Sequence, residues 1–182
     1  MSTTKTRNFG RTAAAASIIA TVWSMGLTPL SAAETGLAAC GSVVGTYVTT
    51  FSDREGVFSS RGLMTFTSDG IFLMSDSAQG GVPGIYDPFG SAQGAWSCLA
   101  ADGEKLSISA VGLNFVLPAD GRTPSFGRVD YQAGLDTKSG MLSGSATLRI
   151  TAGKDLEGAD PIDKPGPVVD KFHFDGERVV AK

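Results

Sequence analysis

The sequence contains little that would support a long helix. No window of a dozen residues combines sustained helical periodicity with freedom from glycine and proline, and glycine occurs 24 times among the 182 residues. Short runs of alternating apolar and polar residues recur instead, separated by glycine, proline and aspartate. Because a period of two is typical of half-buried strands, the chain is predicted to be all-β.

Basic residues, histidine and cysteine are also scarce. The chain has 15 Lys and Arg against 18 Asp and Glu, a single His and two Cys. An acidic chain with scattered charges argues against nucleic acid or an anionic membrane as a partner. No zinc-ligand spacing, nucleophile elbow, phosphate loop or dinucleotide fingerprint is present, so no metal or cofactor is predicted.

Residues 1–33 are typical of a cleaved signal peptide. Three basic residues and no acidic residue precede an apolar stretch at 13–30, and Ser31-Ala32-Ala33 offers small residues for cleavage. The predicted mature chain, 34–182, has the size of one domain and a net charge of −6, because the three removed charges are all basic (−3 − 3). We therefore expect an exported protein, periplasmic or extracellular.

Two other interpretations of the N-terminus remain open. A membrane-spanning helix needs about 20 predominantly apolar residues, and polar residues and Pro29 interrupt the shorter stretch here. Leu37-Ala-Ala-Cys40 resembles a lipoprotein cleavage site, but Glu34-Thr35-Gly36 separates it from the apolar stretch.

In an exported protein, Cys40 and Cys98 predict a disulfide, and a catalytic thiol is disfavoured because His173 lies far away in sequence.

Eight strands are expected in the predicted mature chain. They lie at 42–51, 57–67, 71–76, 94–100, 105–117, 126–135, 141–151 and 168–180. The Asp69-Gly70 step and the segment 136–140 are typical of hairpin turns. Sequential hairpins with one apolar face per strand favour a single antiparallel up-and-down barrel over a two-sheet sandwich, because a barrel leaves no exposed sheet edge.

The two ends of this predicted barrel resemble the calycins. Gly45-Thr46-Tyr47 resembles the Gly-x-Trp of lipocalins and their relatives, and Arg178 resembles the basic residue that packs across that aromatic ring. The resemblance implies structural roles for Gly45, Tyr47 and Arg178. Tyrosine replaces tryptophan here, and no helix is expected before the last strand, where lipocalins have one. Allene oxide cyclase and related bacterial barrel cyclases share the eight-strand plan without that helix.

Ligand-binding candidates are expected on the inner faces and on the long loop that follows residue 76. In the fifth strand, Phe115 is expected to face inward with Val111 and Leu113. Tyr86 and Phe89 of the loop either line the mouth of a pocket, with Asp76, Gln79 and Gln93 as polar contacts, or plug the end of the barrel. Arg178 is an alternative contact for a ligand carboxylate. The predicted ligand-binding residues are Phe58, Met64, Phe66, Asp76, Tyr86, Phe89, Phe115 and Arg178.

Three other polar groups are expected to be solvated. His173 alternates with charged residues and should face outward. Arg128, Asp130 and Gln132 share the face opposite Val129 and Tyr131, so they should line the outer wall unless the register shifts by one residue. An acidic run lacks the spacing of a calcium loop and is interpreted as a solvated loop. Its members are Asp155, Glu157, Asp160 and Asp163.

Three functions remain compatible with the sequence. The leading hypothesis is an exported lipocalin-like barrel that binds a small apolar molecule. A barrel cyclase or isomerase that shapes an apolar substrate in its lumen is the second, because such chemistry leaves little motif trace. The third is a structural envelope protein that docks a partner through its loop face.

Overall fold

The computed structural model describes residues 40–102, 104–153, 158 and 160–181 of the chain. A short 3-10 helix, η1 (Cys40–Val43), precedes eight strands. The strands are β1 (Gly45–Ser52), β2 (Phe58–Phe66), β3 (Ile71–Asp76), β4 (Ala92–Asp102), β5 (Lys105–Val116), β6 (Ser125–Asp136), β7 (Met141–Thr151) and β8 (Val168–Arg178). The predicted signal peptide and the first residues of the predicted domain lie outside the described residues.

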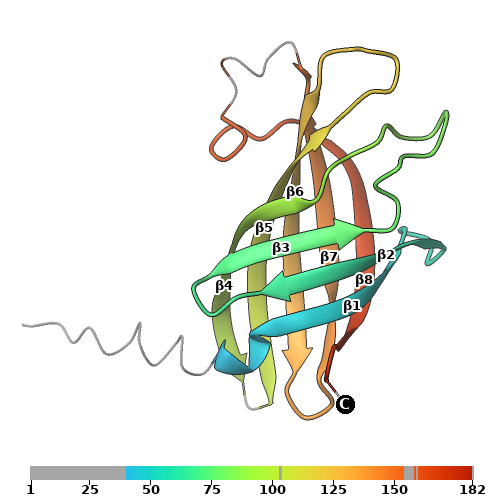
Figure 1. Ribbon diagram of the computed structural model, residues 1–182. Helices are drawn as coiled ribbons and strands as arrows, with labels where there is room; N and C mark the ends of the chain where they lie inside the picture. Colours follow the sequence, from blue (N-terminus) through green and yellow to red (C-terminus); the bar gives the residue numbers. More distant parts are fainter. Residues whose placement is uncertain (1–39, 103, 154–157, 159, 182) are drawn as a thin grey trace, which may run out of the picture.

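The strands close into one antiparallel barrel (Figure 1). Each strand pairs with the next, and β1 pairs with β8 from Tyr47 opposite Arg178 to Ser52 opposite His173. This confirms the predicted all-β fold with eight strands in a closed up-and-down order and excludes the sandwich. The architecture is consistent with the calycin plan. Within the described residues, no helix is long and apolar enough to cross a membrane.

The predicted strand boundaries differ most at the start of the chain. The first strand was expected from residue 42, but Ser42 and Val43 belong to η1, whose turn is closed by a hydrogen bond from the Val44 amide to the Gly41 carbonyl oxygen. β1 therefore starts at Gly45, where φ is +151°, a conformation that favours glycine. This glycine turns the chain from η1 into the wall of the barrel.

Aromatic side chains fill much of the barrel interior. Phe66 of β2 contacts three rings: Tyr47, Phe72 and Trp96, with centroids 5.3–5.8 Å away. Tilted and edge-on contacts of this kind stabilise beyond the area they bury. Smaller apolar side chains from the other strands are also fully buried. The largest fully buried side chains of the barrel are those of Tyr47, Phe72, Phe174, Met64, Ile108 and Leu142.

Small residues in β5 make room for these rings. Its inward row is Leu106, Ile108, Ala110 and Gly112. A Cβ on Gly112 would lie 3.3 Å from the Phe72 ring and 3.4 Å from the Tyr131 ring. The large apolar side chains of the second half of β5 therefore face outward.

Two predicted lumen residues are consequently on the wrong face. Phe115 is 52% exposed and stacks outside the barrel on Phe126 of β6, with centroids 4.8 Å apart. Val111 and Leu113 lie on the same outward face of β5 as Phe115. Phe58 is 63% exposed, because the β1–β2 register shifts between Phe51 and Ser52 and takes Phe58 out of the inward alternation. By contrast, Met64 and Phe66 are buried in the interior as expected.

The two ends of the barrel differ in character. In Figure 1, η1, the β6–β7 hairpin and the C-terminus lie at the lower end. The long connections after β3, β5 and β7 lie at the upper end. We refer to these as the closed end and the loop end.

Candidate functional site

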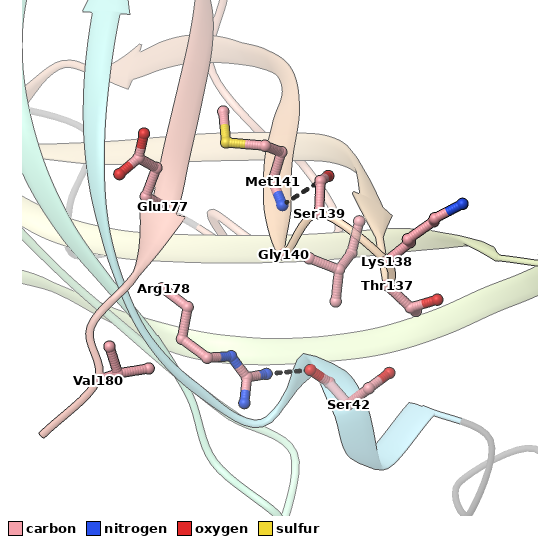
Figure 2. A pocket seen from close by; sticks show the side chains of 10 residues that line it. Ser42, Thr137, Lys138, Ser139, Gly140, Met141, Glu177, Arg178 and Val180 are labelled. Carbon is pink, nitrogen blue, oxygen red and sulfur yellow. Dashed lines mark hydrogen bonds between the residues drawn. The ribbon is translucent and has the colours of Figure 1, made fainter.

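At the closed end, Arg178 ties the last strand to the first. Its guanidinium carbon lies 5.3 Å from the centroid of the Tyr47 ring, and Nη2 donates a hydrogen bond of 2.9 Å to the Tyr47 hydroxyl oxygen. The same nitrogen donates to the carbonyl oxygen of Ser42, as Figure 2 shows. A cation over an aromatic face is worth about 0.5–2 kcal/mol. The predicted packing of Arg178 on Tyr47 is confirmed as a contact.

The disulfide strengthens the same end. Cys40 of η1 and Cys98 of β4 are bonded, as expected, with Cα atoms 6.1 Å apart and a sequence separation of 58. The Tyr47 hydroxyl also donates to the Val43 carbonyl oxygen at 3.0 Å. The short helix is therefore held on β1, β4 and β8 together and covers this end of the barrel.

An open cleft of about 520 Å³ lies beside this closure (Figure 2). Its walls come from η1, the β6–β7 hairpin and the end of β8, and Arg178, Lys138 and Glu177 are its charged residues. Figure 2 shows Arg178 directed toward Ser42, while Lys138 points away from Arg178. Because the guanidinium is already held by Ser42 and Tyr47, the predicted role of Arg178 in binding a ligand stays a prediction, and its observed contacts are structural.

At the loop end, the segment between β3 and β4 extends the barrel wall rather than hanging free. The Phe89 amide donates to Gln79 within the segment, the Gly90 amide donates to Phe115 of β5, and the Leu117 amide donates to Pro88. Phe89 and Val116 form an isolated bridge. These backbone bonds fasten the aromatic loop to the end of β5.

This loop and the β5–β6 connection enclose a second open cleft, of about 500 Å³. It is lined by residues 80–88 together with Ala119, Asp120 and Arg122. Tyr86 lies in this lining with 39% of its surface exposed, and its ring centroid is 6.3 Å from that of Phe89. The neighbouring Ile85 is 77% exposed. The volume is within the range of small-molecule sites, about 300–1,000 Å³.

Arg122 joins the two loops across the cleft. Its Nη2 lies 3.0 Å from Asp87 Oδ2, and its Nε lies 2.7 Å from Asp120 Oδ2. The hydrogen bond from Arg122 holds the pKa of Asp120 below its usual range. Ion pairs this exposed contribute little stability, and of the two only the pair with Asp87 joins one loop to the other.

A second polar group lies inside the barrel at the same end. Asp76 closes the inward row of β3, and its carboxylate accepts hydrogen bonds from Ser60 Oγ at 2.8 Å and from the Ala78 amide at 2.7 Å. Ser60 is almost fully buried. Tyr131 of β6 packs between Phe72 and Phe174, and burial, followed by the negative charge of Asp76, raises its pKa. The charge of Asp76 therefore acts on a phenol that is buried among aromatic side chains.

The raised pKa of Tyr131 predicts a loss of stability at high pH. Below the unfolded-state pKa of about 10 both states keep the phenol proton. Above that pH the unfolded chain loses the proton while the folded protein keeps it, so unfolding becomes easier by up to about 1.4 kcal/mol per pH unit. Urea unfolding across this range should show that slope, and Tyr131→Phe should reduce it. Tyr86→Phe, which changes an exposed ring, is the control; equal slopes in both variants would contradict the prediction.

The remaining predicted residues divide between the two faces. Asp76 faces inward, whereas Gln93 is exposed on the outside of β4, and Gln79 donates to Ser91. His173 is exposed, as expected. Arg128 and Asp130 lie on the outer wall, as expected, but they are half-buried, because Arg128 donates to the carbonyl oxygens of Pro161 and Ile162.

The acidic run is only partly visible. Asp155 and Glu157 lie outside the described residues, and the Asp160 carboxylate accepts from the amides of Ile162 and Asp163, as in an ordinary turn. Among the residues that the structure describes, no three His, Cys, Asp or Glu side chains are grouped to hold a metal ion.

Sequence reasoning missed Ser60, Tyr131 and Arg122. Tyr131 had a usable signal, because it lies on the apolar face of the sixth strand and a tyrosine hydroxyl on an inward face needs a polar neighbour. Ser60 and Arg122 had none, since their partners come from other strands and loops.

A scan against protein-family models, a search of curated proteins and a search of solved structures found no match to this chain.

Proposed function

We propose that this protein is an exported, lipocalin-like barrel that binds a small, mostly apolar molecule at its loop end. The observation that carries the proposal is the cleft between residues 80–88 and the β5–β6 connection, with Tyr86 and Ile85 as its apolar surface. Binding pockets are mostly apolar, with a few polar groups that orient the ligand. Here Arg122, Asp87 and Asp120 supply the polar groups and hold the loops in place before binding.

The site is proposed for the loop end because aromatic side chains occupy much of the lumen. Phe66, Phe72 and Phe174 contact one another or Tyr131 across the interior. A lipocalin-like ligand deep in the barrel would have to displace these rings, at a cost of several kcal/mol. The N-terminal signal pattern and the Cys40–Cys98 disulfide support export.

Binding can be tested by isothermal titration calorimetry with a panel of fatty acids, isoprenoids and aromatic compounds. We expect at least one class to bind and Tyr86→Ala to raise its Kd about tenfold or more, since aromatic anchors dominate such sites. Met141→Ala, a change of an exposed apolar residue at the closed end, is the control. No binding by any class, or equal binding by the Tyr86→Ala variant, would overturn the proposal.

A cyclase or isomerase is the second candidate, and the charge of the half-buried Asp76 acting on the buried Tyr131 favours it. A carboxylate can take a proton from a substrate, and a phenol whose pKa is raised stays protonated and can donate a hydrogen bond to a substrate oxygen. NMR can show whether the protein converts a ligand found in the panel. If it does, Asp76→Asn and Tyr131→Phe should each abolish turnover of that ligand while its binding persists. Turnover that survives both changes would exclude this mechanism.

A further inference from the structure

The outer wall of the barrel is divided by charge. The outward residues of β1 to β4 are threonine, serine, glutamine, aliphatic side chains and Phe58, and Arg61 is the only charged one among those described. After Val169, the outward residues of β8 are instead charged or ionisable and exposed. They are Lys171, His173, Asp175 and Glu177. One side of this acidic protein is therefore almost free of charge.

Four aliphatic side chains project from the uncharged side. They lie on neighbouring strands, with Val48 of β1 opposite Leu63 of β2 and with Ile71 and Leu73 on β3. Each is between 37% and 49% exposed. Figure 1 shows these three strands side by side on the face toward the viewer. A contiguous apolar surface with depleted charge is typical of the core of a protein interface.

The charges at the edges of this wall indicate its occupant. Arg61 lies near the loop end of β2, and its Nη1 donates to Thr50 Oγ1; within the described residues, no carboxylate lies within 4.0 Å of it. Asp69 lies in the β2–β3 turn at the other end, about 20 Å farther along the strand. A hydrogen bond from Thr67 holds the pKa of Asp69 below its usual range, so the carboxylate is ionised at neutral pH.

We propose that the outer wall of β1, β2 and β3 is a self-association surface that binds a second copy of this chain with the strands antiparallel. A two-fold axis that crosses the strands at the paired residues Thr65 and Leu73 places Leu73 of the two copies against each other and Leu63 of each copy near Ile71 of the other. The same axis brings Arg61 of each copy to Asp69 of the other, so opposite charges meet at both ends of the apolar contact.

The size of the wall predicts a reversible dimer. Three strands about 4.8 Å apart and five residues of about 3.3 Å each cover roughly 14 by 17 Å. This is below the standard interface of about 800 Å² per partner. Dissociation should therefore be visible on dilution.

Sedimentation equilibrium over about a hundredfold range of concentration tests the proposal. The unmodified protein should shift from monomer to dimer. Leu63→Glu, which sets a carboxylate of each copy against apolar side chains of the other, should raise the dimer Kd by at least about tenfold. Ser143→Glu, on the outer face of β7, should leave the dimer unchanged. Circular dichroism confirms that each variant is folded, and Leu63→Thr provides a milder change at the same position.

A charge exchange tests the orientation. Arg61→Glu and Asp69→Arg should each weaken the dimer, and the double variant should restore it, because each new pair again unites opposite charges. A monomer at every concentration at which the protein stays soluble would overturn the proposal. A dimer that is insensitive to Leu63→Glu, or a double variant no stronger than the single ones, would overturn it equally.

Discussion

Replacing Phe66 with alanine is expected to lower the free energy of unfolding by about 3–5 kcal/mol. The ring is buried at 2% exposure and contacts Tyr47, Phe72 and Trp96, so its removal leaves a cavity that the surrounding rings cannot fill. A loss of this size is a large part of the total stability of an ordinary domain, about 5–15 kcal/mol.

Phe58→Ala is the matched control for this prediction. The same residue type, on the same strand, is 63% exposed outside the inward alternation, and its replacement should change stability by about 0.5 kcal/mol or less. Urea unfolding of both variants gives the comparison. Similar losses in the two variants would contradict the assignment of Phe66 to the core and Phe58 to the surface.

Removing the disulfide has the second largest expected effect. The bond closes a loop with a sequence separation of 58, and the chain-entropy model predicts a contribution of about 4 kcal/mol from restricting the unfolded chain. The Cys40→Ser, Cys98→Ser double variant should unfold at correspondingly lower urea concentration. Its refolded barrel should keep the far-ultraviolet spectrum of the parent, because the strand pairing does not depend on the bond.

Two further measurements distinguish the stability lost with the disulfide from stability lost through a disrupted closed end. Reduction of the unmodified protein should destabilise it as much as the double substitution does. Arg178→Lys, which keeps the charge but loses the planar guanidinium on Tyr47, should have a smaller effect, about 0.5–2 kcal/mol. A disulfide contribution no larger than that of Arg178 would mean that the unfolded chain is not significantly restricted by the bond.

The strand order could be predicted because turn signals and alternation are local. Asp69-Gly70 and the hairpin at 136–140 lie between the strands that they were expected to join. The face of β5 could not be predicted, because the larger apolar side chains in its second half share one face and that face is the outer one. What decides that face is the volume of Phe72 and Tyr131, which belong to β3 and β6 and require Gly112 on the inside.

The candidate site was predictable only in part for a similar reason. Asp76 and Tyr86 lie in a loop whose length and aromatic content mark it in the sequence. Ser60 meets Asp76 across the β2–β3 hairpin, whereas Tyr131 comes from β6 and is brought under the influence of Asp76 only by the assembled barrel. The contact of Arg122 with Asp87 likewise joins residues 35 positions apart in two irregular loops.

The pairing of β1 with β8 has a consequence for the folding pathway. It joins Tyr47 to Arg178, 131 positions apart, whereas each of the other seven pairings joins neighbouring strands. Long-range pairings form slowly, because loop closure must precede the contacts that stabilise it. A chain that has formed the meander from β1 to β7 therefore still has two free sheet edges. Until β8 docks, that intermediate can pair with other chains, so refolding yield should fall with rising protein concentration.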